Sequence, residues 1–292
     1  MSSQPDSAEL QPFRDDTDRP PETKSDEDDT AARKRQRRVV IFIIVVAAVV
    51  LVVIAVIVIG VVLGLLLNQA EASLELITRG IEDEKSTLIR YDQEQENTFK
   101  TATDLIQGVL KGYDLDELSD KAKANLVDCN DTTGAQPGKS CIFSIDKLGE
   151  KCTENRKFGY PEGAPCILLR FSAPVHWTPD PYVKTDIEYD NMVRQLNQSG
   201  LDLPLPGDIP VTCTGQYPVD QELLTSRVQY WPKRGFEGYY FPRTTEEEYM
   251  DPLLMVQFKK PTLGVVIMIE CTAWAKNIFK GKNKVQFELL VD

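Results

Sequence analysis

An uninterrupted apolar run from Val39 to Leu67 constrains this chain more than any other feature. Its 29 residues include no charged group, no amide and no hydroxyl, and as a helix they would be about 43 Å long. The hydrocarbon core of a bilayer needs about 20 residues. The core of a signal peptide has roughly 7–15, and a buried helix of a soluble domain keeps a polar stripe that this run lacks. The sequence therefore predicts one transmembrane helix over residues 39–67, in contact with the lipid bilayer.

The charges on either side of the run predict its orientation. Basic residues stand directly before it, and mainly acidic residues follow it. Because basic flanks stay in the cytosol, we expect a single-span type II protein with a cytosolic N-terminus and an extracellular C-terminus. The alternative for the basic cluster at 33–38 is a nuclear-localisation signal, which we weigh far lower beside a membrane span. Residues 1–38 have few apolar side chains, so we expect a disordered cytosolic tail that ends in this basic stop.

The charge balance and the single histidine exclude some classes of protein. The chain carries a formal net charge of −12, and the residues after the span hold most of it, with 35 acidic and 25 basic side chains. Nucleic-acid binding needs clustered positive charge, so we expect no nucleic-acid partner. One histidine makes a His-rich metal site or a multi-histidine catalytic centre a poor expectation, and we expect no cofactor.

Six cysteines all lie after the span, which predicts three disulfide bonds in an extracellular domain. They are Cys129, Cys141, Cys152, Cys166, Cys213 and Cys271. Free or metal-bound cysteines are the alternative, but no C-x-x-C pair supports it. Spacing alone leaves 15 connectivities open. Two sequons, at Asn130 and Asn197, lie on the same side and are expected to be accessible to glycosylation.

The sequence after the span divides into two regions of different composition. Residues 68–128 are polar and helix-favouring, and a stripe at helical spacing followed by Gly112 predicts a helix that packs on its own domain. The stripe consists of Phe99, Ala102, Ile106, Val109, Leu110 and Tyr113. Residues 129–292 are rich in β-branched and aromatic residues, and we expect a mainly β, antiparallel sandwich. The expected strands are Ile142–Ile145, Cys166–Phe171, Val211–Thr214, Leu253–Phe258, Val265–Ala275 and Val285–Val291.

No catalytic constellation is present in the sequence. Type II proteins include many lumenal glycosyltransferases, which commonly hold a metal with a D-x-D pair, and Asp114-Leu115-Asp116 is the one extracellular instance. It follows a predicted helix end and more simply begins a turn or caps the next helix. His176 lies in a Pro-rich stretch, where a packed or surface role is the better interpretation. We found no G-x-S-x-G, H-E-x-x-H or P-loop motif.

The sequence around the cysteines resembles the β subunits of Na⁺/K⁺-transporting P-type ATPases. Residues 159–166 (GYPEGAPC), 211–215 (VTCTG), 269–273 (IECTA) and 251–258 (DPLLMVQF) are similar to that family. Residues 234–242 (RGFEGYYFP) and the terminal ELLVD are similar to its invertebrate, nervana-like branch. The gastric H⁺/K⁺ pump's β subunit shares most of these marks, but the 234–242 block favours the Na⁺/K⁺ form.

This resemblance implies a non-catalytic subunit at the plasma membrane that pairs with a P-type ATPase catalytic α subunit. It would support folding and delivery of α and K⁺/Na⁺ transport. It also implies an immunoglobulin-like sandwich and sequential disulfides: Cys129–Cys141, Cys152–Cys166 and Cys213–Cys271. The residues expected to contact α are Phe42, Gly60, Gly64, Tyr239, Tyr240, Phe241 and Pro242. Gly60 and Gly64 are a small-xxx-small pair that lets another helix approach closely. A corner of the sandwich core is an equal alternative for the aromatic block.

Two features depart from the family pattern. Phe42 is the one aromatic residue in a span where relatives carry several, and residues 68–85 are Glu-rich and could continue the helix, where relatives have a Pro/Gly-rich extended segment. The main alternative function is therefore a pump-independent adhesion or junctional paralogue.

Overall fold

The computed structural model describes residues 25–67, 71–79, 86–134, 136–224, 228–244 and 249–292, with the side chains of 33–61 within the first range. These residues divide into two units, one ending at Gln69 and one running from Ala70 to Asp292. The predicted tail at 1–24 and part of the Glu-rich segment, at 68–70 and 80–85, lie outside the described residues.

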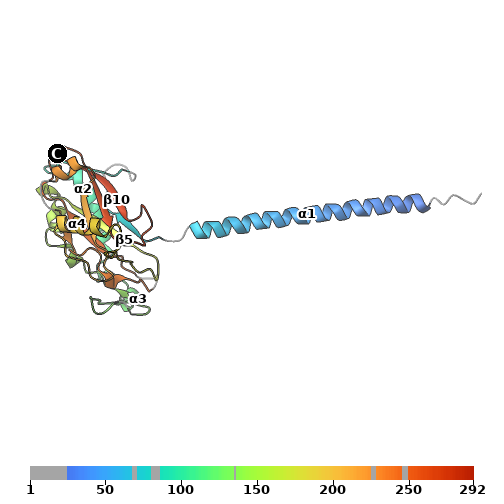
Figure 1. The fold of residues 1–292 in the computed structure, drawn as a ribbon, viewed down its shortest axis with the longest axis horizontal. Coiled ribbons are helices and arrows are strands. Elements are labelled where there is room, and N and C mark those ends of the chain that lie inside the picture. The colour runs from blue at the N-terminus through green and yellow to red at the C-terminus, as the bar shows by residue number, and fades with distance from the viewer. Residues whose placement is uncertain (1–24, 68–70, 80–85, 135, 225–227, 245–248) are drawn as a thin grey trace, which may run out of the picture. The chain divides into compact units, whose positions relative to one another are not determined.

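The first unit contains one long helix, α1 (Ser25–Leu67), which Figure 1 shows as continuous. By length and composition, its segment Arg33–Val61 is apolar enough to cross a membrane, and none of that segment is buried. The helix begins before Val39 and includes residues 25–38, which the sequence alone assigned to the tail. Acidic residues at 26–29 followed by basic residues at 33–38 suit the dipole at a helix start and the good helix propensity of Ala, Arg and Lys.

The second unit is β-rich and also contains short helices. Its strands are β1 (Ser73–Leu76), β2 (Leu88–Tyr91), β3 (Leu126–Val127), β4 (Ser140–Cys141), β5 (Cys166–Ser172), β6 (Val211–Gly215), β7 (Gln229–Trp231), β8 (Leu253–Gln257), β9 (Ile267–Ala273) and β10 (Lys284–Val291). Its α-helices are α2 (Glu96–Lys111), α3 (Asp120–Asn125), α4 (Tyr189–Ser199) and α5 (Pro218–Leu223). Its 3-10 helices are η1 (Ile145–Leu148), η2 (Glu154–Glu162) and η3 (Gly238–Tyr240).

Two four-stranded sheets hold the unit together. The first has the order β1-β5-β8-β7 and is antiparallel throughout. The second has the order β2-β10-β9-β6, and β2 runs parallel to β10. A further small sheet pairs β3 with β4 in parallel. The expectation of a wholly antiparallel arrangement is therefore wrong at these two parallel pairs, which are not hairpins and are set by long-range contacts.

Alternation along the strands produces one shared core. In β10, Phe287, Leu289 and Val291 are buried while Gln286 is exposed, as its sequence predicts. Apolar residues of both sheets belong to the same cluster. β5 and β8 are buried on both faces along most of their length because η2 and η1 cover the outer side of their sheet. Burial of apolar surface stabilises this doubly covered layer, at about 25 cal/mol per Å².

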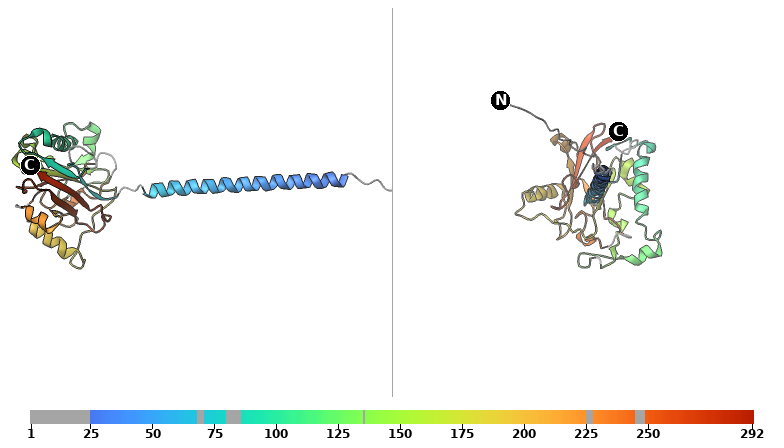
Figure 2. Two further views of the ribbon diagram at one scale, coloured as in Figure 1. Left: turned by 90° about the horizontal axis from the view of Figure 1, so that it is seen from above. Right: turned by 90° about the vertical axis from the view of Figure 1, so that its right-hand side faces the viewer.

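Helices α2 and α4 flank opposite edges of the second sheet. Helix α2 packs on β2 and α4 packs on β6, and Figure 2 shows the two helices on opposite sides of the strands. The predicted stripe on α2 is confirmed: Phe99, Ala102 and Ile106 are buried. The Phe99 ring packs on Tyr91 of β2 and Tyr160 of η2. This aromatic cluster fixes the helix against both neighbours.

The predicted secondary structure differs from the structure in two places and agrees with it in the other expected strands. The described parts of the segment 68–128, residues 71–79 and 86–128, contain β1 and β2 as well as helices, and residues 71–79 are not helical. The expected strand Ile142–Ile145 is absent, because β4 ends at Cys141 and the Ser144 hydroxyl accepts from Asp146 N to cap η1. The other expected strands correspond to β5, β6, β8, β9 and β10, with ends within two residues.

Candidate functional site

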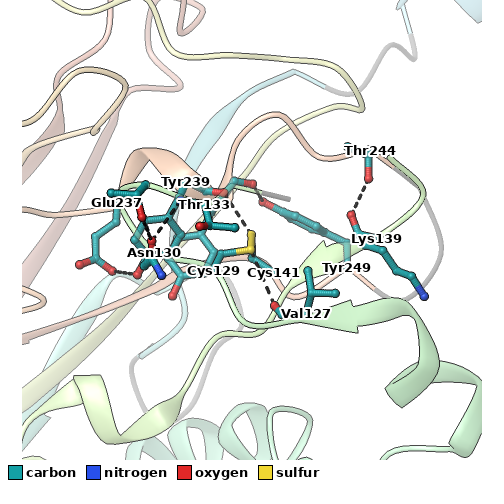
Figure 3. The surroundings of a disulfide bond; sticks show 12 residues. Val127, Cys129, Asn130, Thr133, Lys139, Cys141, Glu237, Tyr239, Thr244 and Tyr249 are labelled. Carbon is teal, nitrogen blue, oxygen red and sulfur yellow. Dashed lines mark hydrogen bonds between the residues drawn. A yellow bond between two sulfur atoms is a disulfide. The ribbon is translucent and has the colours of Figure 1, made fainter. Parts of the chain in front are cut away.

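The aromatic block Arg234–Pro242 lies against the disulfide-closed loop Cys129–Cys141. Figure 3 shows Tyr239 beside that disulfide, and the Sγ of Cys141 is 3.1 Å from the Tyr239 carbonyl oxygen. Lys139 is tied to the segment after the block, because Thr244 Oγ1 donates to its carbonyl oxygen at 2.6 Å. The loop and the block therefore form one structural site.

Two glycines bring the block close to the chain before β6. A Cβ on Gly235, whose φ is +88°, would lie 2.3 Å from the Ile209 carbonyl oxygen. A Cβ on Gly238 would lie 2.6 Å from the Gly207 carbonyl carbon. Only glycine permits both approaches. The contact is closed by Phe236 and Ile209, which exchange two backbone hydrogen bonds of 2.8 and 3.0 Å.

The aromatic side chains of the block divide between core and surface. Tyr240 and Phe241 are 1% and 8% exposed, and Phe236 is buried as well. Phe241 packs edge-on against Phe171 and Trp177, and Tyr240 packs on Phe143. These three rings thus form the corner of the core that was the alternative to an interface anchor. Tyr239 and Pro242 are half-buried and reach the surface.

A network of charges surrounds Arg234. Its guanidinium donates to both carboxylate oxygens of Asp131, at 3.0 and 2.6 Å. It also lies 3.2 Å from Asp208, whose side chain is 2% exposed, and 3.5 Å from Glu237. Asp208 accepts from the backbone N–H groups of Leu205 and Gly238, both at 2.8 Å. Arg234 therefore links the Cys129–Cys141 loop, the chain before β6 and the block.

The network also shifts several pKa values. The hydrogen bond from Arg234 lowers the pKa of Asp131. Burial raises the pKa of Asp208, although its two backbone hydrogen bonds and Arg234 oppose that shift. Lys147 donates to Glu237 at 2.9 Å and to the Tyr239 hydroxyl. Burial would lower the pKa of Lys147, but its partners raise it, so it is a stable cation at neutral pH.

The sequence pattern indicates Tyr239 to Pro242 but not the charged residues that hold them. Arg234, Asp208 and Lys147 are far apart in sequence, and no spacing joins them. The one available signal was the pair Arg234 and Glu237, three residues apart inside an aromatic stretch. Charges placed among aromatic residues are a sign of a paired, half-buried network.

All six cysteines form disulfides. The bonds are Cys129–Cys141, Cys152–Cys166 and Cys213–Cys271, which is the pairing that the resemblance implies. Cys213 and Cys271 are direct cross-strand partners in β6 and β9, as their positions in predicted strands indicated. Both sequon asparagines, Asn130 and Asn197, are exposed.

The remaining candidate residues lie apart from this site. Phe42 and Gly60 are on α1, where Phe42 is exposed and no atom lies within 4 Å of a Cβ built on Gly60. Gly64 is also in the helix, and its surroundings lie outside the described side chains. Asp114 Oδ1 accepts from Asp116 N, which begins a turn, and Ser119 is the residue that caps α3. His176 is exposed.

Among the described residues, no group of three or more His, Cys, Asp or Glu side chains could hold a metal ion. The site presents a charged and aromatic face that is fixed by the Cys129–Cys141 disulfide and by the contacts of Arg234.

Comparison with known proteins identifies the family. The family model described as sodium/potassium ATPase beta chain matches residues 39–292. The chain belongs to that family. It is 32% identical over 221 residues to the Drosophila melanogaster sodium/potassium-transporting ATPase subunit beta-2, covering 73% of this chain and 68% of that protein. It is 28% identical over 216 residues to subunit beta-1 of the same species, covering 72% and 67%.

Membership of this β-chain family confirms two predictions: the chain is a β subunit of this class, and it is not itself an enzyme. The human sodium/potassium-transporting ATPase subunit beta-2 is 25% identical over 157 residues, covering 52% of this chain and 46% of that protein. The greater similarity to the Drosophila proteins agrees with the invertebrate character of residues 234–242.

Proposed function

We propose that this chain is the β subunit of a Na⁺/K⁺-transporting P-type ATPase. In this role it binds the catalytic α subunit, supports its folding and its delivery to the plasma membrane, and is required for K⁺/Na⁺ transport. The observation that carries the proposal is the family match, which runs from the start of the apolar span to the last residue of the β-rich unit.

The proposed topology is type II. Residues 1–38 are cytosolic, 39–67 cross the membrane, 68–128 form a juxtamembrane region, and 129–292 form the disulfide-linked extracellular part. Basic flanks stay in the cytosol, which supports this orientation. The disulfides and the exposed sequons at Asn130 and Asn197 belong to an oxidising, glycosylating compartment.

The proposed contacts with α use two surfaces. In the span, Phe42, Gly60 and Gly64 meet a helix of α. Outside, Tyr239 and Pro242 are the members of the block with exposed surface, and the buried rings of Tyr240 and Phe241 hold them in place. A half-buried aromatic residue on a rigid support is a typical interface anchor.

An immunoglobulin-like classification is part of the proposal. Two four-stranded sheets around one core support it. One difference stands against a close likeness to antibody domains: their disulfide joins the two sheets, whereas Cys213–Cys271 joins neighbouring strands of a single sheet.

Co-expression with an α subunit tests the proposed function. We expect the full chain to co-purify with α in mild detergent, to raise the amount of α at the cell surface and to support ouabain-sensitive rubidium uptake. Failure to co-purify would refute the proposal. A chain that aggregates cells in the absence of α would instead support the adhesion alternative, which the single aromatic residue of the span, Phe42, favours. Proton-coupled, rather than sodium-coupled, potassium uptake would indicate the H⁺/K⁺ form.

A further inference from the structure

The turn between β9 and β10 presents an aromatic residue among unpaired lysines. Phe279 is 61% exposed at this turn. Lys280 and Lys282 are exposed beside it, and neither forms an ion pair with another described residue. Lys276, in contrast, lies 3.3 Å from both Asp180 and Asp186. We call Phe279, Lys280 and Lys282 the tip.

The tip is fastened to the strand that follows the membrane span in sequence. Leu74 N donates to the Lys282 carbonyl oxygen at 2.8 Å, and Lys282 N donates to the Phe279 carbonyl oxygen at 2.9 Å. Strand β1 begins six residues after α1 ends. The tip is therefore bonded to the part of the β-rich unit that follows the span most closely in sequence.

A hollow of about 720 Å³ lies beside the tip. Its lining includes Trp177 and Tyr182, together with Lys276, Phe279 and Lys280. Aromatic faces attract quaternary ammonium groups, and lysine ammonium groups attract phosphate. A phosphatidylcholine headgroup contains both groups, a quaternary ammonium and a phosphate.

We propose that the tip lies in the headgroup layer of the membrane leaflet that α1 enters from the extracellular side, with Phe279 inserted and Lys280 and Lys282 on lipid phosphates. Aromatic residues favour the membrane interface, and lysine side chains extend from it to the headgroups. This proposal rests on α1 spanning the membrane and does not require pairing with a catalytic subunit. It gives the β-rich unit a second attachment to the bilayer and so restricts its tilt.

Spin labels on the full chain in phosphatidylcholine nanodiscs test the proposal. Because all six native cysteines are in disulfides, a single introduced cysteine takes the label. Phe279→Cys is compared with Leu263→Cys, which is 53% exposed. Leu263 lies at the other end of β10, since Gly264 N donates to the Val291 carbonyl oxygen. That strand places the two ends roughly 24 Å apart.

Collision of the label with oxygen, which enters lipid, and with a nickel chelate, which stays in water, reports the depth. We expect oxygen to dominate at residue 279 and the nickel chelate at residue 263. Equal, water-like profiles at both sites would overturn the proposal. Protection of residue 279 from both reagents, seen only with a bound α subunit, would also overturn it, because the tip would then contact protein.

Charge reversal separates the lysines from the aromatic residue. Lys280→Glu combined with Lys282→Glu should abolish the oxygen preference at residue 279. The control, Lys259→Glu with Lys260→Glu in the β8–β9 connection, should leave it unchanged. An unchanged profile in the first variant would refute the role of the lysines. A label at Val50 tests the span itself: water exposure there would refute the spanning helix, whereas a buried Val50 with a water-exposed residue 279 would refute the tip alone.

Discussion

Arg234 joins three segments of the β-rich unit through the buried Asp208 and the exposed Asp131. Removing one partner of a buried pair leaves an uncompensated charge, at a cost of about 3–5 kcal/mol. Asp208 would keep two backbone hydrogen bonds. We therefore expect Arg234→Met to lower the free energy of unfolding by about 2–3 kcal/mol, measured by denaturant unfolding in detergent.

A matched control uses an exposed arginine. Arg156 pairs with Glu162, and their side chains are 42% and 45% exposed, so Arg156→Met should cost less than about 1 kcal/mol. Equal losses in the two arginine variants would show that the network does not stabilise the block.

Asp251 provides a pH-dependent prediction at the same scale. Burial raises the pKa of Asp251 to about 6, although Arg170 and Arg243 oppose the shift. Its folded pKa lies above its unfolded value near 3.8, so the folded state holds the proton more tightly. The contribution of this group to stability is therefore greatest at low pH and falls as the pH rises from about 4 to 6.

Asp251→Asn removes this titration. The variant should gain stability relative to the native chain as the pH rises from 4 to 6, by at most about 2–3 kcal/mol, in unfolding curves recorded at each pH. Asp104→Asn, at an exposed side chain paired with Lys100, serves as the control. A constant difference between Asp251→Asn and the native chain across this range would contradict the prediction.

At the scale of elements, the disulfides differ in the length of chain that they close. Cys213–Cys271 closes 58 residues and Cys152–Cys166 closes 14. In the chain-entropy model these loops are worth about 4 and about 3 kcal/mol. We expect replacing the first pair by alanines to cost more than replacing the second, in denaturant unfolding. The reverse order would show that local packing, not loop closure, decides their contributions.

Sequence predicted the elements whose pattern is strong and local. Helix α2 has a full apolar stripe, and β10 alternates over eight residues. Strand β1 has four residues and is stabilised by its partner, because Arg170 of β5 donates to Glu75 at 2.7 and 3.0 Å. Such pairing across 95 residues leaves no local signal. The Glu-rich texture around β1 therefore indicated helix, and tertiary contacts overrode that propensity.

The candidate site was likewise only partly predictable, because its aromatic block is a local pattern and its packing depends on long-range contacts. The aromatic block is visible in sequence, but aromatic side chains fill cores and interfaces alike. Only the packing of Phe241 on Phe171 and Trp177 decides in favour of the core. Tyr239, in the same run, reaches the surface because its hydroxyl meets Glu237 and Lys147.

Helix α1 provides the next prediction. Substituting leucine at both Gly60 and Gly64 should weaken association with α, because side chains would block close helix approach. Ala47→Leu with Ala55→Leu is the control: at 100° per residue both positions lie about 140° from Gly60 around the helix axis. Co-purification with α should fall several-fold in the glycine variant only. Unchanged recovery would place the helix contact elsewhere on the span.

At the scale of the whole molecule, the orientation of the membrane span decides which residues face the cytosol and which can form disulfides and carry glycans. In the proposed type II topology, the positive flank at 33–38 keeps the tail in the cytosol, and the cysteines and sequons enter the lumen during synthesis. We expect the full chain to carry glycans at Asn130 and Asn197, so that peptide N-glycosidase increases its mobility and each Asn→Gln substitution removes one increment. An epitope at the N-terminus should become accessible only after the plasma membrane is permeabilised.

Asn277→Gln is the control, because Asn277 is exposed but lies in no sequon. Two results separate the causes of failure. An accessible N-terminus on intact cells with no glycan would mean that the span is inverted, which would also remove any extracellular contact with α. One glycan with a protected tail would leave the topology intact and assign the difference to local access at one sequon.

Asn130 is the sensitive position, because its carboxamide oxygen accepts from Thr132 N and Thr133 N at 2.9 and 3.1 Å once the Cys129–Cys141 loop has folded. Because these hydrogen bonds fix the carboxamide, we expect glycan transfer there to precede closure of the loop, and Cys129→Ser with Cys141→Ser to raise occupancy at Asn130 while leaving Asn197 unchanged.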